Sequence, residues 1–193
     1  FGKVTLSIKA LKSQLARTNF LLRKLSSTVS REVLRTAYFG FFEARMCYAI
    51  LLWGNSPSAS EIFKLQKAAV RILAGVGHGE SCRQIFPSLG ILTMYARYAL
   101  VSLVHIRANV ERYGKRAHQH DTRQKHLLKA ELHRLTATQR YNVDFTATKL
   151  FNSIPDSIRS LPLPTFKKMV RSSLSAAAIY SMDEFFKVKF ISG

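Results

Sequence analysis

The stretch TAYFGFFEARMCYAILLWGNSPSASEIFKLQKAAVRILAG, residues Thr36 to Gly75, decides how this chain folds. It begins in a long apolar run that contains the only tryptophan, Trp53. Ser30 has the chemistry of an N-cap for a helix from Arg31 to about Trp53. The apolar residues of that helix nearly encircle its axis, and a helix that is apolar all round is usually buried. We therefore predict that it is the central strut of the fold.

A second, amphipathic helix follows a short polar break. Pro57 prevents the first helix from continuing, and Ser58 with Glu61 has the spacing of a capping box. The helix ends at Gly75, where a left-handed backbone is favoured. Three of its basic residues share one side at intervals of three and four residues: Lys64, Lys67 and Arg71. The two helices are expected to pack together and found the core.

A basic helix is predicted upstream, because apolar residues recur on one helical stripe from Val4 to Leu25. The opposite side carries only positive charge, from Lys9, Lys12, Arg17, Arg23 and Lys24. No acidic residue precedes Glu32. A solvated helix face usually mixes both signs to gain pairing energy. This face therefore predicts phosphate contact, or else pairing with acidic residues upstream of Phe1.

Further helices follow and no strand pattern occurs. A short helical turn is predicted from Ser81 to Leu89, and Thr93 can cap a helix to about Tyr113. The chain is therefore predicted to be all-α. It is expected to form a multi-helix bundle over residues 1–113, a basic connector over 114–138 and a small C-terminal helical lobe over 139–193.

The charge balance is the unusual feature of the composition. The 193 residues include 30 Lys and Arg against 11 Asp and Glu, which gives a net charge of +19 and a pI near 10.5. Such an excess costs self-repulsion in the folded state and is typical of proteins that meet a polyanion. Nucleic acid is the leading predicted partner, and an anionic membrane surface is the second.

The cysteines and the apolar runs predict a chain that works inside the cell. Cys47 and Cys82 lack CxxC spacing, so we expect no disulfide scaffold and a reducing compartment. The chain shows no signal peptide at its start, and we expect a protein that is intracellular and not secreted. The apolar runs are far too short to span a bilayer. The start at Phe1 is typical of a piece of a longer polypeptide.

The connector is rich in histidine and basic residues. Its candidate nucleic-acid contacts are Arg116, His118, Arg123, Lys125 and Arg134. Arginine and lysine neutralise phosphates, and neutral histidines hydrogen-bond or stack on bases. The alternative is a zinc site made by His118, His120, His126 and His133. The absence of cysteine thiolates at tight spacing argues against that site.

Three segments of the sequence are similar to segments of a known protein family, and they occur in the same order. They are "YAILLWGNS…A…IFKLQKAAVRIL.GV" followed by "CR..F..L.IL", then "HQHDTR", then "TATKLFNSIPDSIRSLP…FKKMVRSSL". The order resembles the region after the polymerase core of jockey-like non-LTR (LINE-type) retrotransposon reverse transcriptases. The second segment resembles the family's "H.Y.TR", with His120 in place of tyrosine. The third resembles its "YN.LP..I" element and final "FK..L" helix, and the resemblance covers about Ala10 to Phe186.

The resemblance implies the thumb and C-terminal region of an RNA-directed DNA polymerase whose catalytic aspartates lie upstream of Phe1. Polymerase chemistry needs paired carboxylates that hold two divalent metals. No such pair on a hairpin occurs here, so we expect no activity from this chain alone. We expect no cofactor or metal in it either, since the metals belong to the upstream palm.

The implied partners are RNA and DNA, as a template–primer duplex or element RNA, and the upstream polymerase core, with no membrane. The implied location is the nucleus and cytoplasm, as a ribonucleoprotein. The predicted contacts on the helices are Lys9, Lys12, Arg17, Lys24, Lys64, Lys67 and Arg71, joined by the connector residues. The alternative is a degenerate or host-retained transposon remnant that acts, if at all, as a protein-interaction module.

Overall fold

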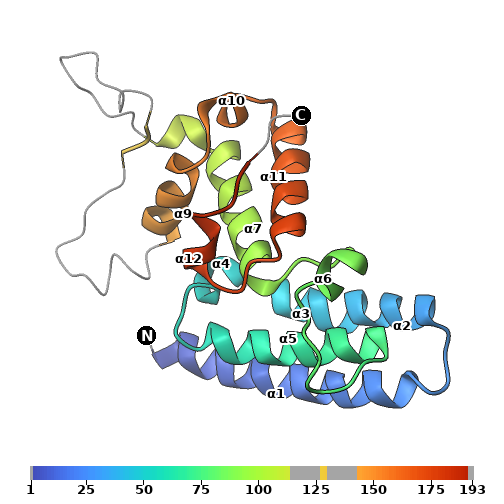
Figure 1. The fold of residues 1–193 in the computed structure, drawn as a ribbon. Helices are drawn as coiled ribbons and strands as arrows, with labels where there is room; N and C mark the ends of the chain where they lie inside the picture. The colour runs from blue at the N-terminus through green and yellow to red at the C-terminus, as the bar shows by residue number, and fades with distance from the viewer. Residues whose placement is uncertain (1, 114–126, 130–142, 191–193) are drawn as a thin grey trace, which may run out of the picture.

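The computed structural model describes residues 2–113, 127–129 and 143–190 of the chain. Over these ranges the regular structure is helical and contains no strand, which confirms the all-α prediction. The helices form two groups that meet near the start of α7 (Figure 1).

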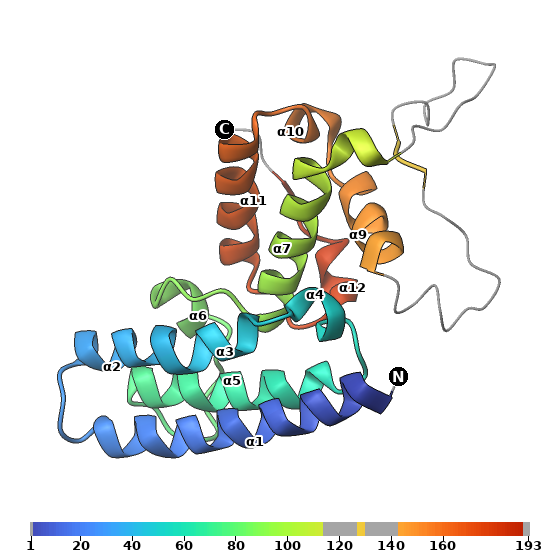
Figure 2. The ribbon, with the colours of Figure 1, turned by 180° about the vertical axis from the view of Figure 1, so that it is seen from behind.

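The first group consists of three rods. They are α1 (Gly2–Leu25), the broken rod α2 (Arg31–Ala37), η1 (Tyr38–Glu43) and α3 (Ala44–Cys47), and α5 (Ala59–Ala74). Figure 2 shows the three rods side by side. Helix α1 buries Ile8, Leu15 and Leu22, one residue per heptad. This single stripe faces the other two rods, so the opposite side of α1 is left to solvent.

Three predicted helix ends are confirmed and one is wrong. Ser30 caps α2, because its hydroxyl accepts the Val33 N–H at 3.4 Å. Thr93 likewise caps α7, and Gly75 closes α5 with a φ of 70°. Ser58 is helical itself, with φ −75° and ψ −8°, and its side chain makes no capping bond. The capping box fails because the Glu61 carboxylate pairs with Lys12 on α1 instead.

The predicted continuous helix from Arg31 to Trp53 is also wrong. It passes through the π-helical turn η1, ends at Cys47 and restarts as α4 (Ile50–Trp53) after Ala49, which has a φ of 50°. Nor is it buried all round: Tyr48 is 79% exposed, Leu52 64% and Phe41 47%. The reason is its position, since the rod lies at the edge of the three-helix group and is covered on one side only.

The second group surrounds α7 (Met94–Ala108). It contains α9 (Val143–Asn152), α10 (Asp156–Arg159), α11 (Leu163–Ala177) and α12 (Met182–Phe185), with α6 (Ile85–Ser88) and the turn η2 (Val110–Arg112) at the two ends of α7. Both α9 and α11 pack directly on α7. The predicted domain limits stay a prediction. Helix α7 contacts α4 and α5, which precede the connector in the sequence, and α9 and α11, which follow it.

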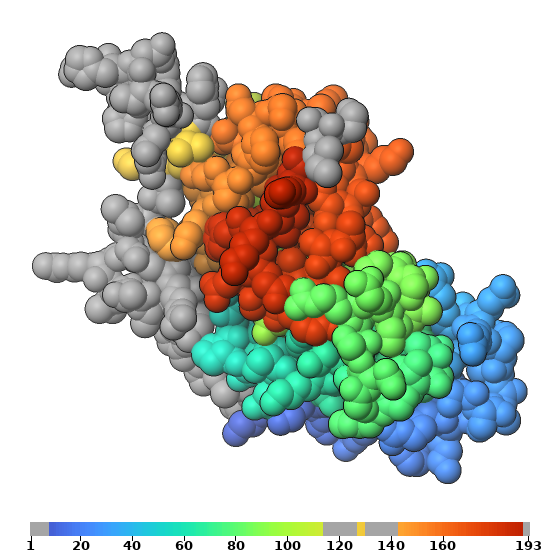
Figure 3. All heavy atoms as spheres, in the orientation of Figure 1, coloured from blue at the N-terminus to red at the C-terminus, as the bar shows by residue number. Residues whose placement is uncertain are grey.

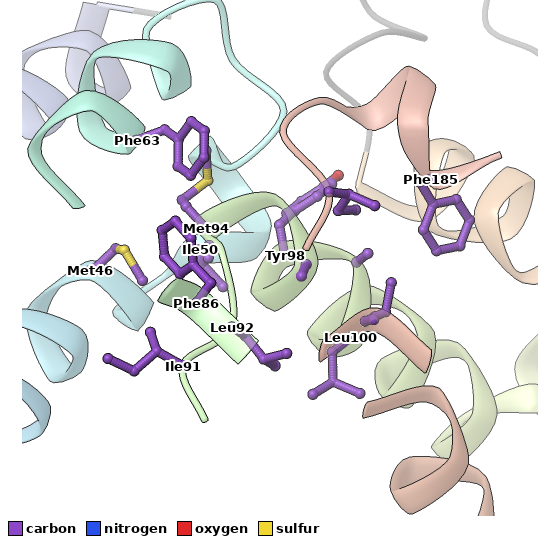
Figure 4. Close-up of a cluster of buried hydrophobic side chains, with 14 of the residues drawn as sticks. Met46, Ile50, Phe63, Phe86, Ile91, Leu92, Met94, Tyr98, Leu100 and Phe185 are labelled. Carbon is purple, nitrogen blue, oxygen red and sulfur yellow. The ribbon is translucent and has the colours of Figure 1, made fainter. Parts of the chain in front are cut away.

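A buried amide joins the two groups. Gln66 of α5 is fully buried, and its Nε2 donates to the Tyr38 hydroxyl (3.1 Å) and to the Leu92 carbonyl (2.9 Å). Its Oε1 accepts the Met94 N–H at 2.7 Å. Apolar side chains fill the space around this junction, as Figure 4 shows for Met46, Phe63 and neighbouring residues. Gln66 therefore fixes the start of α7 against two rods.

An ion pair lies beside this junction. Arg97 of α7 pairs with Glu43 at the end of η1, and both side chains are largely buried. Burial raises the pKa of the Glu43 carboxyl, and the positive charge of Arg97 opposes that rise. Thr93 adds a further tie, because its hydroxyl donates to the Ile179 carbonyl at 2.7 Å. Together these bonds hold the N-terminal rods, α7 and the C-terminal segment in one arrangement.

We expect Gln66→Ala to lower the free energy of unfolding by about 2–4 kcal/mol, because it leaves three buried polar groups without a partner. Urea unfolding followed by circular dichroism measures the change. The control is Gln84→Ala, which removes the same amide from an exposed position and is expected to change stability by less than about 0.5 kcal/mol. Equal stabilities for the two variants would refute the role of Gln66.

The C-terminal segment is held by a bidentate ion pair. Arg83 donates to both carboxylate oxygens of Glu184, at 2.9 and 3.0 Å, and Glu184 also accepts the Tyr180 N–H. Figure 3 shows the C-terminal segment on the surface beside the residues that follow α5. The hydrogen bond from Arg83 is the main reason that the pKa of Glu184 is lowered.

This lowered pKa predicts a pH dependence. A carboxyl whose pKa is lower in the folded state adds stability above its unfolded pKa, and this is lost as the pH falls through its folded pKa. The pair is partly exposed, so Glu184→Gln is expected to cost about 0.5–1 kcal/mol at pH 7. The cost should begin to shrink as the pH falls below the unfolded pKa of about 4.3, and it should vanish once the pH is below the lowered folded pKa. Asp183→Asn is the charge-matched control, and thermal unfolding at both pH values tests the difference.

Candidate nucleic-acid interface

Three of the predicted contacts lie along the solvent side of α1. Lys9, Arg17 and Lys24 are exposed, opposite the stripe that α1 buries. The helix carries no acidic residue, and these three make no ion pair with any described residue. With a rise of about 1.5 Å per residue, Lys9 and Lys24 are roughly 22 Å apart along the axis. Their charge is therefore free to meet several phosphates of one backbone.

Lys12 is exposed, but its charge is already paired. It forms an ion pair with Glu61 of α5, and that hydrogen bond lowers the pKa of the Glu61 carboxyl. The pair links the middle of α1 to the first turn of α5. Lys12 thus offers less free charge to a ligand than the other predicted residues of α1.

Two of the three basic residues of α5 are engaged by other parts of the fold. Lys64 is exposed, whereas Lys67 lies over two rings, 5.2 Å from the Phe63 centroid and 5.6 Å from that of Tyr180. Arg71 turns toward the loop after α5, where its Nε donates to the Glu80 carbonyl at 2.9 Å. Cations over aromatic faces and on carbonyls stabilise their surroundings. We therefore assign Lys67 and Arg71 to the packing of the C-terminal segment and the loop.

The connector residues lie outside the described ranges. These are Arg116, His118, Arg123, Lys125 and Arg134, and also the histidines of the alternative zinc site. In the part of the chain that the structure describes, no three His, Cys, Asp or Glu residues are grouped so that they could hold a metal ion.

Several exposed residues near α1 were missed by sequence reasoning. Phe20 and Phe41 are exposed, and each lies under a cation: Lys24 is 5.8 Å from the Phe20 centroid and Arg45 is 5.9 Å from that of Phe41. Exposed rings beside basic groups are typical of single-strand binding surfaces. The aromatic residues of 38–48 were assigned to the core because their helix is apolar all round. Arg45, a charge in the middle of that run, was the available signal for an open side.

No protein-family model matches the chain, and the searches of curated proteins and of solved structures returned no significant match. The resemblance to retrotransposon reverse transcriptases stays a prediction. None of the described helices combines the length and apolar character needed to cross a membrane.

Stability measurements can distinguish Arg71, which is bonded within the fold, from Lys64, which is exposed. We expect Arg71→Gln to lower the free energy of unfolding by about 0.5–1.5 kcal/mol, because the Glu80 carbonyl loses a charged donor. Lys64→Gln removes the same charge from an exposed position and is expected to cost less than about 0.5 kcal/mol. Chemical denaturation measures both. If the Lys64 variant loses as much stability as the Arg71 variant, the structural role of Arg71 is refuted.

Proposed function

We propose that this chain is the non-catalytic, nucleic-acid-binding thumb and C-terminal part of a non-LTR retrotransposon reverse transcriptase. It would grip a template–primer duplex or the element's RNA beside a polymerase core on the same polypeptide. That core would hold the catalytic aspartates and divalent metals, and the assembly would act inside the cell as a ribonucleoprotein. The observation that carries the proposal is the unpaired positive face of α1, formed by Lys9, Arg17 and Lys24.

The arrangement of charge supports backbone contact. A rigid helix places its cations at fixed spacing, so binding does not require the helix to become ordered. Two acidic groups beside α1 are already engaged, since Glu61 pairs with Lys12 and Glu43 with Arg97. These two carboxylates therefore oppose little of the attraction that phosphates meet on the outer side of α1. Contacts of this kind recognise the backbone of a polynucleotide and carry no base sequence.

The test is the salt dependence of binding to an RNA–DNA hybrid duplex, measured by fluorescence anisotropy between about 50 and 200 mM salt. The variant Lys9→Gln/Arg17→Gln/Lys24→Gln removes three charges from α1. Each phosphate contact contributes about 0.9 to the slope of log K against log salt on a duplex, so the slope should become shallower by about 2.7.

A matched variant on another helix controls for net charge. Lys167, Lys168 and Arg171 are exposed on α11, and Lys167→Gln/Lys168→Gln/Arg171→Gln also removes three charges. It should leave most of the salt slope in place. Equal losses in both variants would mean diffuse attraction to the whole protein and would reject α1 as the interface. A wild-type chain whose binding does not change with salt would reject the function.

The second candidate is a protein-interaction module left by a transposon. The exposed apolar side chains Phe20, Leu21 and Leu52 favour it, because such groups usually mark contact surfaces when they gather. Light scattering distinguishes the two functions. The module predicts concentration-dependent association that persists at high salt, and the nucleic-acid function predicts a chain that stays dispersed without a polyanion.

A further inference from the structure

A groove runs between α1 and the segment from α3 to α4. It consists of two adjoining hollows of about 260 and 320 Å³. Leu11, Tyr48 and Trp53 line the first hollow, Arg17 and Leu21 line the second, and Gln14 and Arg45 line both. Figure 2 views the molecule from the side on which α1 and α3 lie in front of α5. The shared residues make the two hollows one continuous groove.

Arg45 is held in place at the middle of this groove. Its Nη1 donates to the Thr18 hydroxyl at 3.1 Å and to the Phe41 carbonyl at 2.9 Å, and its guanidinium lies over the Phe41 ring. The side chain is exposed, and its Nε and Nη2 have no partner among the described residues. A guanidinium already fixed by two bonds loses little freedom when it binds a phosphate. The groove thus holds a preorganised anion contact.

Tyr48 is held outside the fold at one end of the groove. The backbone turns sharply after it, because Ala49 adopts a left-handed conformation with a φ of 50°. The indole Nε1 of Trp53 donates to the Tyr48 carbonyl at 3.0 Å and fixes this turn. Left-handed non-glycine residues persist only where neighbours determine them, and they gather at functional positions. The result is a ring that is 79% exposed beside a cationic groove.

No acidic side chain occurs among the described residues that line the groove. Helix α1 has no acid, and residues 44–53 have none. Glu43, which precedes that segment, is buried and paired with Arg97. Arg17 and Arg45 are the charged residues that line the hollows. The ligand that suits these walls is an anion with a flat apolar part.

We infer that this groove binds a single-stranded nucleic acid, with phosphates on Arg17 and Arg45 and one base stacked on Tyr48. The inference rests on the proposed function and names the strand that this surface takes. A duplex presents phosphates but keeps its bases paired and stacked, so it cannot use the Tyr48 ring. A single strand offers both parts, and stacking on aromatic rings is how such strands are held without regard to sequence.

The experiment compares two probes of equal charge with the full chain. One is a single-stranded oligouridylate of 12 nucleotides, and the other is an abasic strand with the same number of phosphates. Anisotropy at constant salt gives the affinity for each. Tyr48→Ala should weaken binding of the oligouridylate roughly 5- to 150-fold and leave the abasic strand unchanged. Tyr48→Phe should bind like the wild type, and Arg45→Gln should weaken both probes.

Leu52→Ala is the matched control, because Leu52 is an exposed apolar residue of α4 next to the groove segment. It should change neither affinity. Tyr48 is largely exposed, so Tyr48→Ala should unfold at the wild-type temperature, which thermal unfolding checks. The inference is overturned if Tyr48→Ala weakens both probes equally or neither of them. A competition experiment gives a second test. The inference is also overturned if polyglutamate of the same charge displaces the bound oligouridylate as effectively as the abasic strand displaces it.

The hybrid duplex separates this inference from the proposed function. Tyr48→Ala should not change duplex affinity or its salt slope. Duplex binding that depends on α1, together with single-strand binding that ignores Tyr48, would overturn the groove and leave the proposed function in place. The reverse result, with Tyr48-dependent single-strand binding and no duplex binding, would support the groove and reject the duplex grip.

Discussion

The hydrogen bonds of the Gln66 amide are the constraint on which the rest of the structure depends. One fully buried side chain bonds to η1, to the segment before α7 and to the first residue of α7. A buried amide is tolerated only when its polar atoms are matched, so the three segments have one favourable placement relative to α5. The direction in which α7 leaves the N-terminal rods follows from this. The positions of α9 and α11 follow in turn, because both pack on α7.

Three of the 11 acidic residues of the chain join separate elements of the fold. Glu61 links α1 to α5, Glu43 links η1 to α7, and Glu184 holds the C-terminal segment on Arg83. Each pair removes a negative charge from the surface together with a single positive one. The remaining basic residues are left in excess, and Lys9, Arg17 and Lys24 of α1 face solvent with no ion pair to a described residue. The proposed function depends on this outward positive charge.

The sequence predicted helices better than their breaks. The stripe of α1, the caps at Ser30 and Thr93 and the glycine end of α5 were all readable, because each depends on residues close together in the chain. The break at Ala49 was not readable. Alanine has no intrinsic preference for a left-handed backbone, and the Trp53 indole that fixes the turn acts only once the chain is folded.

The candidate site could be predicted only in part, for the same reason. Lys9, Arg17 and Lys24 were found because one exposed helix face can be read from periodicity. Lys67 and Arg71 share such a face, yet the C-terminal segment and the loop after α5 take up their charges. Arg45 and Tyr48 were missed because the run looks apolar on every side, and the charge of Arg45 is its one local sign of an open side. Residues whose role depends on a distant segment cannot be assigned from local pattern.

The long reach of two contacts has a consequence for how the chain is made. Thr93 bonds to Ile179, 86 residues later, and Arg83 bonds to Glu184, 101 residues later. Contacts between residues so distant form slowly, because a long loop must close before they contribute. During synthesis the N-terminal rods can assemble first, while the apolar side of α7 remains uncovered until α9 and α11 have left the ribosome. Truncated products would expose that side and would be prone to aggregate or to be degraded.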